Sequence, residues 1–490
     1  MKHLPSKLTA VLMASAALAG CAVGPNYVRP SAPLSPTFKE ASGWSPAAPA
    51  DALDRGDWWS LFGDPILNGL EARVQVNNQN VIAAEAAYRQ ARAIVAEDRG
   101  QLFPTITLNG SGTQSGSGGG GKGSVVTGAD GTPIITGGGG GTSASSYRAN
   151  VGASWQPDVW GRIRRTIEGA KSNAQASAAD LESAKLSAQG ELATDYFGLR
   201  EADAEMAIDR ATAADYQRAL TIAQNRYNAG VTVRSDVYQA QTQLANAQAD
   251  LAGTEQTRAN FEHAIAVLVG EAPGNFTLSA AAWVATVPGL PATVPSALLQ
   301  RRPDIAGAER RAQAANAQIG VQVSTFFPNI TLTGSYGYAS NQLANLISTP
   351  NSLWSYGLAA AETLFNGGAR VAAVRSAKSA RDQAVAKYRE TVLEAMQDVE
   401  NQLSATDVLG RQADLRRQAS AAADAAATIV FNQYKSGQVA YTDVVTAQTA
   451  AYTARRAVVQ TAAQRQTTAV ALIQSLGGGW KAGSDPKASR

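Results

Sequence analysis

The sequence predicts an α+β membrane protein that combines a few short strands with very long helices. Three observations support this fold class. The chain contains an internal repeat, each copy of the repeat holds two segments of alternating polarity, and each copy continues into an Ala- and Gln-rich helical stretch. About 65 helical residues span roughly 100 Å, which no ordinary globular domain requires. Such a rod needs neighbouring helices, as in a coiled coil or bundle.

The repeat is visible in two pairs of matching segments. LFPTITLNGSG at 102–112 matches FFPNITLTGSY at 326–336, and the stretch 226–248 matches 433–455 in the same order. The first copy is longer because a Gly-rich insertion, 116–141, lies inside it; its composition predicts a flexible loop. A repeat of this length is a duplicated half-domain and not a solenoid unit.

Each copy contains the same sequence of helices. Apolar residues recur every three or four positions in the opening stretches Leu67–Gly100 and Asp304–Ser324. The long helices are expected over 162–228 and 370–434, and after a Gly-containing turn a returning helix runs to about 270 or 477.

Four segments alternate with a period of two, which predicts strands. They are 104–113, 147–158, 329–338 and 354–358. Each presents one apolar, aromatic face and one small, polar face. A soluble sandwich would point the apolar face at a core, whereas an outer-membrane barrel points it at lipid. We favour the barrel because the lipoprotein signal at the N-terminus places the chain at the outer membrane.

Four strands cannot close a barrel, and an open edge cannot remain in lipid. The chain must therefore assemble, and a dimer would give eight strands while a trimer would give twelve. The strand pattern alone does not choose between them.

The N-terminus predicts export and lipidation. Residues 1–20 carry Lys2 and Lys7 before a short apolar run, as in a secretory signal peptide; the alternative is a buried helix with a core cysteine. LAGC at 18–21 resembles a lipobox, which implies cleavage before Cys21, an S-diacylglycerol on its sulfur and an N-acyl chain on its amine. Several acyl chains anchor a protein stably. Ala22 follows, and not the aspartate of inner-membrane retention, so we expect the outer membrane.

Composition excludes several functions. Removing Lys2 and Lys7 leaves the mature chain nearly neutral, which argues against a nucleic-acid partner. Only two histidines are present, and no nucleophile–base or metal-ligand pattern is found, so we expect neither an enzyme nor a cofactor other than the lipid.

Several motifs together resemble the outer-membrane efflux protein family. They are CAVGPNYVRP at 21–30, DVWGRIRR at 158–165, RRPDIAGAERRAQAANAQIG at 301–320, LFNGGAR at 364–370 and the paired Y-x-x-G…D-V turns. More narrowly, the chain is similar to the lipidated branch that serves resistance-nodulation-division drug pumps. The resemblance implies a homotrimer with a twelve-stranded β-barrel, four strands per chain. It also implies a long periplasmic α-helical coiled-coil barrel and a mixed equatorial belt.

The same resemblance implies an exit duct that passively conducts drugs or other small molecules. Its partners would be a periplasmic adaptor (membrane fusion) protein, an inner-membrane resistance-nodulation-division pump and outer-membrane lipid. One alternative is the exit duct of a type I protein secretion system. A second is a non-conducting, lipid-anchored periplasmic coiled-coil scaffold.

The resemblance places the periplasmic mouth at the hairpin turns near 226–237 and 433–444. The expected adaptor-docking residues are Gly230, Gly437, Tyr227 and Tyr434. The expected aperture residues are Asp236, Asp443, Thr442 and Thr446. A ring of aspartates in a narrow pore favours cations, although both aspartates also suit the N-cap of a returning helix. Thr442 and Thr446 stand where some relatives carry a leucine and an aspartate, so those gating roles are not transferred.

The expected domain order is as follows. A signal peptide (1–20) precedes a lipidated extended segment with belt residues (21–60), repeat 1 (61–270), an equatorial linker (271–300), repeat 2 (301–476) and a C-terminal tail (477–490). Trp58 and Trp59 are expected to pack in the belt.

Overall fold

The computed structural model describes residues 22–32, 39, 57–116, 124–127, 133–136, 143–288 and 302–478. The signal peptide, Cys21, most of the segment before Trp58, the linker after Pro288 and the C-terminal tail lie outside these residues. The chain divides into two compact units. One contains 92–171 and 313–381 with the N-terminal segment up to Val28, and the other contains 29–91, 172–312 and 382–490.

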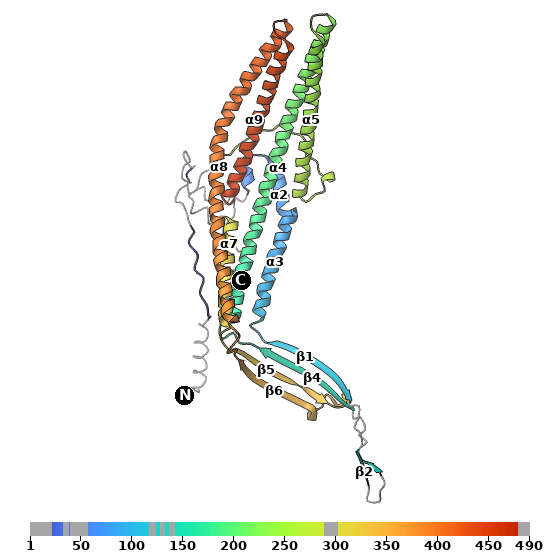
Figure 1. Ribbon diagram of the computed structural model, residues 1–490, viewed down its shortest axis with the longest axis vertical. Helices are drawn as coiled ribbons and strands as arrows, with labels where there is room; N and C mark the ends of the chain where they lie inside the picture. The colour runs from blue at the N-terminus through green and yellow to red at the C-terminus, as the bar shows by residue number, and fades with distance from the viewer. Residues whose placement is uncertain are drawn as a thin grey trace, which may run out of the picture. The chain divides into compact units, whose positions relative to one another are not determined.

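The first unit holds a four-stranded antiparallel sheet in the order β1-β4-β5-β6 (Figure 1). Its strands are β1 (Thr105–Gly116), β4 (Ser143–Trp155), β5 (Asn329–Ser340) and β6 (Ser352–Ala361). The two repeats meet at its centre, where β4 of the first pairs with β5 of the second. This sheet, combined with the long helices, confirms the predicted α+β fold class and the four strands per chain.

The Gly-rich insertion contains two further short strands. β2 (Ser124–Thr127) and β3 (Pro133–Thr136) pair antiparallel as a separate sheet. The prediction of a flexible loop over 116–141 is therefore wrong for these residues. The two central residues of each strand, Val-Val and Ile-Ile, are β-branched, and such residues favour extended backbone even among glycines.

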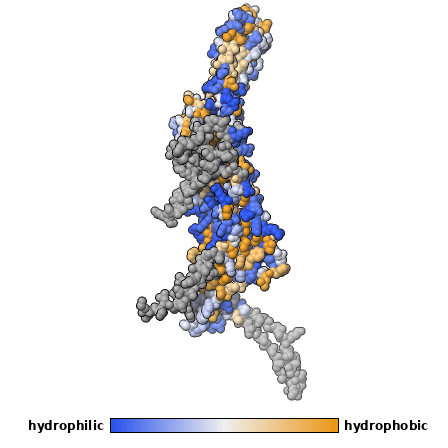
Figure 2. Space-filling view, turned by 90° about the vertical axis from the view of Figure 1, so that its left-hand side faces the viewer, coloured by the Kyte–Doolittle hydropathy of each residue, from blue (hydrophilic) through white to orange (hydrophobic). Residues whose placement is uncertain are grey.

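The long helices form two antiparallel hairpins, seen at the top of Figure 1. α4 (Arg162–Asn228) and α8 (Ala369–Lys435) have 67 residues each, and the returning helices α5 (Arg234–Leu268) and α9 (Tyr441–Ser475) have 35 each. Figure 2 shows hydrophilic residues interspersed with hydrophobic ones along the hairpins. Among the described residues, no helix is both long enough and apolar enough to cross a membrane.

The opening helix of the first repeat is broken, and the prediction of one helix over Leu67–Gly100 is wrong. α2 (Pro65–Asn77) and α3 (Gln79–Gly100) are separated by the non-helical residue Asn78. The Oδ1 of Asn78 accepts from the backbone N–H of Asn80 at 3.0 Å and of Val81 at 3.2 Å, so it caps α3. In the second repeat, α7 (Pro303–Ser324) is a single helix, as predicted.

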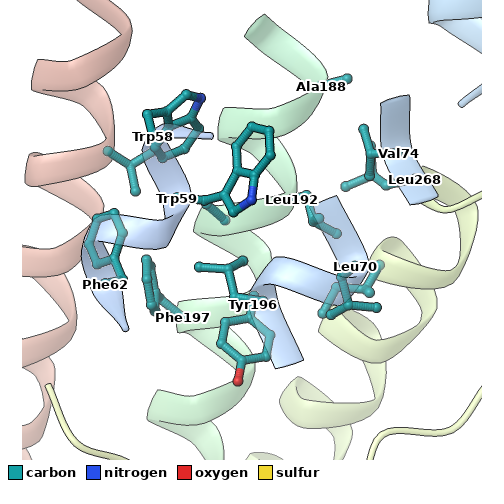
Figure 3. Close-up of a cluster of buried hydrophobic side chains, with 14 of the residues drawn as sticks. Trp58, Trp59, Phe62, Leu70, Val74, Ala188, Leu192, Tyr196, Phe197 and Leu268 are labelled. Atoms are coloured by element: carbon teal, nitrogen blue, oxygen red, sulfur yellow. The ribbon is translucent and has the colours of Figure 1, made fainter. Parts of the chain in front are cut away.

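The main core of the second unit surrounds a short 3₁₀ helix, η2 (Trp58–Phe62). Figure 3 shows the aromatic side chains of η2, together with Leu70 and Val74 of α2, in one cluster with Leu192, Tyr196 and Phe197 of α4. The rings of Phe62 and Phe197 lie 4.9 Å apart. Trp58 and Trp59 are both buried, and the indole N–H of Trp58 donates to Gln189 at 3.3 Å. Both tryptophans therefore pack in this core, and their assignment to an equatorial belt stays a prediction.

One buried ionisable residue of the second unit has no hydrogen-bond partner among the described residues. Glu71 of α2 is fully buried, and neither carboxyl oxygen has a hydrogen-bond partner in the described part of the chain. Burial raises the pKa of Glu71 to about 9. The side chain is therefore protonated at neutral pH.

Candidate functional site

The four-stranded sheet has one apolar face, and the strand register defines it. Leu108, Val151, Tyr336 and Trp354 form one row across all four strands. The apolar and aromatic residues of this face include Ile106, Leu108, Tyr147, Ala149, Val151, Ala153, Trp155, Ile330, Leu332, Tyr336, Tyr338, Trp354, Tyr356 and Leu358. Leu108 is 81% exposed and Tyr356 83% exposed in the single chain. A continuous apolar surface of this kind requires an apolar environment or a partner.

The opposite face of the sheet is small and polar. It comprises Thr105, Thr107, Asn109, Ser111, Arg148, Asn150, Ser154, Thr333, Ser335 and Ser355, with Leu353 as its one large apolar residue. Ser335 and Ser355 share a hydrogen bond of 2.9 Å across β5 and β6. Residues of this kind suit contact with water, as on the inside of an outer-membrane barrel.

Both edges of the sheet are unpaired within the described part of the single chain. β1 and β6 are the outer strands, and each pairs with a neighbour on one side only. The free N–H and C=O groups of such edges are templates for pairing with another chain.

The two hairpin turns are built in the same way. Gly230 has φ +70° and Gly437 has φ +78°, in the left-handed region that glycine adopts at little cost. Gly230 N–H donates to the carbonyl of Tyr227, and Gly437 N–H donates to that of Tyr434, both at 2.9 Å. The residue after each glycine donates to the carbonyl of the third-last helical residue, which completes the Schellman cap.

The two tip tyrosines differ although they are equivalent in the repeat. Tyr227 is 38% exposed, whereas Tyr434 is 1% exposed and packs 5.3 Å from the ring of Tyr441. The hydroxyls of Tyr434 and Tyr441 are buried and have no partner among the described residues. Burial raises the pKa of both tyrosines. Tyr227 thus offers an accessible aromatic surface, and Tyr434 is part of the tip's core.

Arg226 connects the two tips and is not among the residues that the sequence predicts. Its Nη1 donates to the carbonyl oxygens of Tyr434 at 2.6 Å and Lys435 at 3.3 Å, and the guanidinium lies 4.7 Å from the centre of the Tyr434 ring. The alignment of the two repeats could have indicated Arg226, because it matches the uncharged Gln433 in the second copy. A charge at one of two equivalent positions indicates a contact that the repeats do not share.

The structure places both tip aspartates inside the returning helices. The N-caps of α5 and α9 are Val233 and Ala440, so the N-cap interpretation of Asp236 and Asp443 is wrong. Each aspartate is the third residue of its helix, where a carboxylate favours the free N–H groups and the helix dipole. The Oδ2 of Asp443 accepts from the N–H of Ala440 at 3.2 Å, and Asp236 accepts from the Thr232 hydroxyl.

Three of the expected aperture residues lie together on α9. Thr442, Asp443 and Thr446 all lie on the first turns of the helix, and Asp236 lies on α5. The hydroxyl of Thr446 donates to the carbonyl of Thr442 at 3.0 Å, so the helix itself satisfies it. The exposed Asp443 therefore presents the charge of this turn.

A polar network joins the two hairpins away from their tips. Arg456 of α9 pairs with Glu205 of α4 at 2.7 Å, and Tyr452 of α9 donates to Asp209 of α4 at 2.9 Å. Thr254 of α5 donates to the other oxygen of Asp209 at 2.8 Å. Three helices are thereby held in register by charge-assisted hydrogen bonds.

The segment that follows Cys21 is held firmly in the strand-containing unit. The guanidinium of Arg165 donates to the carbonyls of Val23 and Gly24 at 3.2 Å and to Asn26 Oδ1 at 2.8 Å. Gly24 has φ +95°, and a Cβ there would overlap the Cα of Gly320. The residues of the CAVGPNY motif therefore form a strap with a specific seat. Cys21 itself lies outside the described residues.

In the described part of the chain, no group of three or more His, Cys, Asp or Glu side chains is placed to hold a metal ion.

Comparison with known proteins gives a consistent result. The family model described as "Outer membrane efflux protein" matches residues 71–271 and 294–478. The probable efflux pump outer membrane protein TtgC of Pseudomonas putida is 28% identical over 467 residues, which cover 94% of this chain and 93% of that protein. The cation efflux system protein CusC of Escherichia coli is 26% identical over 480 residues, 97% of this chain and 99% of that protein.

Solved structures agree with these relatives. The outer-membrane channel OprN superimposes with a TM-score of 0.80 at 27% identity, covering 94% of this chain and 100% of that chain. The open state of the Neisseria gonorrhoeae MtrE outer membrane channel gives a TM-score of 0.79 at 28% identity, covering 94% and 99%.

Proposed function

This chain belongs to the outer membrane efflux protein family, and we propose that it is the outer-membrane exit duct of a tripartite efflux pump. It is a transport protein and not an enzyme, as its family shows. Drugs or other small molecules would pass through it passively, driven by a pump in the inner membrane.

The two-faced sheet is the observation that carries this proposal. Its apolar face matches lipid, its polar face matches a water-filled lumen, and its free edges β1 and β6 require further copies to close. A soluble sandwich would bury the row that contains Leu108 and Trp354. Both side chains are instead open to the surroundings in the single chain.

Three copies suit a duct better than two. A dimer would give an eight-stranded barrel, whose interior side chains fill. A trimer would give twelve strands and a wider lumen. We therefore propose a homotrimer whose sheets form one twelve-stranded barrel and whose hairpins form a periplasmic α-helical barrel.

The hairpin tips are the proposed periplasmic mouth. Gly230, Gly437 and the exposed Tyr227 would form the surface that a periplasmic adaptor contacts. Asp443, with Thr442 and Thr446 beside it, and Asp236 would line the aperture. In a trimer the two aspartates supply six carboxylates, which favour cations.

The proposed anchor is a lipidated Cys21 in the outer membrane. The seat of residues 22–28 supports it, because Arg165 and Asn316 hold the residues next to the modified cysteine by hydrogen bonds. Cys21→Ser would remove the acyl chains and leave a chain that still trimerises if the strands insert on their own.

The proposed partners are a periplasmic adaptor protein and a resistance-nodulation-division pump. Several relatives are named as outer-membrane proteins of efflux pumps, which supports this choice. A type I protein secretion duct is the alternative, and the lipobox argues against it. A non-conducting scaffold is a second alternative, which the exposed apolar face of the sheet disfavours.

Planar-bilayer recording beside native mass determination tests the proposal. The detergent-purified protein should have the mass of three lipidated chains and give small, mostly closed, cation-favouring currents. A monomer that never conducts would leave only the lipid-anchored scaffold.

A further inference from the structure

Arg148 of β4 carries the one charge found on the described strands. None of β1 to β6 contains another Asp, Glu, Lys or Arg. Arg148 is exposed and forms no ion pair with a described residue. A single charge among the Thr, Ser, Asn and Gly residues of the polar face calls for a functional explanation.

The register places Arg148 on the polar face of the sheet. It pairs with Ser111 of β1 and with Ala339 of β5, and the next pair on the same face joins Asn150 to Asn109. The same side chain on the apolar face would be strongly disfavoured near the centre of the bilayer. In a barrel, Arg148 therefore faces the lumen.

Symmetry multiplies this charge. We infer that three copies of Arg148 form a cationic ring inside the strand barrel, which attracts anionic solutes such as carboxylates, phosphates and sulfonates to the lumen. This inference rests on the proposed function, because one chain supplies only one member of the ring.

Dimensions allow the three guanidinium groups to act together. Twelve tilted strands about 4.8 Å apart give a backbone diameter of roughly 24 Å, which leaves the three groups about 10 Å from one another. This separation is close to the Debye length of about 8 Å at physiological ionic strength. Their potentials overlap across the lumen, and the low-dielectric wall of the barrel strengthens the field.

The chemistry of guanidinium sets the class of solute. Its planar donors bind carboxylate and phosphate oxygens in pairs, and it remains charged at any physiological pH. The hairpin tips present the opposite charge through Asp236 and Asp443. The chain thus carries an anion-attracting element and a cation-favouring element in different units.

The test uses the absence of other cysteines. Cys21 is the single cysteine of the chain, and in the lipidated protein its sulfur is blocked. Asn150→Cys then introduces one free thiol on the polar face, two residues from Arg148. Its reaction rates with anionic sulfonatoethyl and cationic trimethylammonioethyl methanethiosulfonate are measured on full-length protein in outer-membrane vesicles. The tips need not open, since the reagents enter through the barrel.

Arg148 should raise the ratio of the anionic reaction rate to the cationic reaction rate at the thiol of Asn150→Cys. Arg148→Gln should lower the ratio of anionic to cationic rates about five-fold or more, because the potential acts in opposite directions on the two reagents. Arg148→Lys keeps the charge and should preserve the ratio. Val151→Cys, on the apolar face, is the control that should react with neither reagent.

Two results would overturn the inference, and they are distinguishable. If Asn150→Cys reacts and Arg148→Gln leaves the ratio unchanged, the lumen is correctly assigned but the ring does not exist. If Asn150→Cys is unreactive while Val151→Cys reacts, the faces are reversed, and the barrel of the proposed function fails together with the ring.

Discussion

Arg226 and Tyr434 join the tips of the two helical hairpins. Nη1 of Arg226 donates to the Tyr434 carbonyl at 2.6 Å while its guanidinium lies over the ring. Arg226→Met keeps much of the side-chain length but removes this charged hydrogen bond, which is worth about 1.5–3 kcal/mol. We predict that the tips separate more readily and that the open fraction in planar-bilayer recordings rises about ten-fold or more.

Arg218→Met is the matched control. Arg218 lies two turns earlier on α4, is largely exposed and contacts Asp215 on its own helix. Its removal should leave the open fraction unchanged. Equal currents from the Arg226 and Arg218 variants would show that the contact between the tips does not restrain opening.

Glu71 predicts an unusual dependence of stability on pH. Burial raises its pKa to about 9, so the folded chain holds a proton that the unfolded chain releases above about pH 4.5. The folded state binds more protons, and stability therefore falls as pH rises from about 4.5 to 9. Glu71→Gln should remove a cost of about 3 kcal/mol at pH 7.

Melting temperatures in detergent between pH 6 and 8.5 measure this effect. The Glu71→Gln protein should melt higher than the parent, with a flatter dependence on pH. Glu97→Gln, at an exposed position of α3, should keep the parental slope. Parallel slopes for the parent and Glu71→Gln would mean that the carboxyl is ionised through an unrecognised partner.

The strap after Cys21 depends on the close approach of two glycines. A Cβ at Gly24 would overlap the Cα of Gly320, and Gly24 also has positive φ. Gly24→Ala should displace the strap and remove the amide protection of Val23, whose N–H donates to the carbonyl of Trp160 at 3.1 Å. Hydrogen exchange of residues 22–28 measures this loss.

Gly63→Ala separates the effect of the steric overlap at Gly24 from the effect of its positive φ. Gly63 has φ +68°, but a Cβ there meets nothing within 4 Å. It should pay only the left-handed backbone cost of about 1–2 kcal/mol and leave the strap protected. Unchanged protection of Val23 in Gly24→Ala would contradict the proposed seat.

Adjacent residues of β4 should respond oppositely to a new charge. Val151→Arg places a guanidinium on the apolar face, at a cost of about 2–4 kcal/mol per chain in the bilayer, whereas Asn150→Arg places it in the lumen. The first variant should lose most of its heat-modifiable oligomer from the outer-membrane fraction, and the second should keep it. Equal amounts of oligomer from the two variants would contradict the assignment of the faces.

The sequence predicts elements well where local and tertiary preferences agree. α4 begins and ends at the predicted residues, because Gly161 and Gly230 flank a continuous helical pattern. The strand segments appear because alternation matches a sheet with two different environments. The break at Asn78 is not predicted, because its amide caps α3 and also donates to Leu268 in a distant helix, a tertiary contact that periodicity does not encode.

The residues of the hairpin tips also show that local sequence patterns do not encode tertiary contacts. Gly230 and Gly437 are recognisable because left-handed turns demand glycine. Arg226 and the burial of Tyr434 depend on how two distant hairpins meet, and the repeat hides the difference between Tyr227 and Tyr434. Glu71 lies in an ordinary helical pattern, and its burial comes from the tertiary structure, which the local pattern does not encode.

Closure of the sheet by three chains is tested most directly by cross-linking its free edges. Thr107→Cys on β1 and Ser355→Cys on β6 place thiols on the same face of opposite edge strands. The chain has a single native cysteine, Cys21, whose sulfur would be blocked in the proposed lipidated protein. A short bismaleimide should produce covalent dimers and trimers on a denaturing gel and nothing larger. Each single-cysteine variant should fail to exceed two chains. A ladder that ends at two chains, or continues beyond three, would contradict the twelve-stranded barrel.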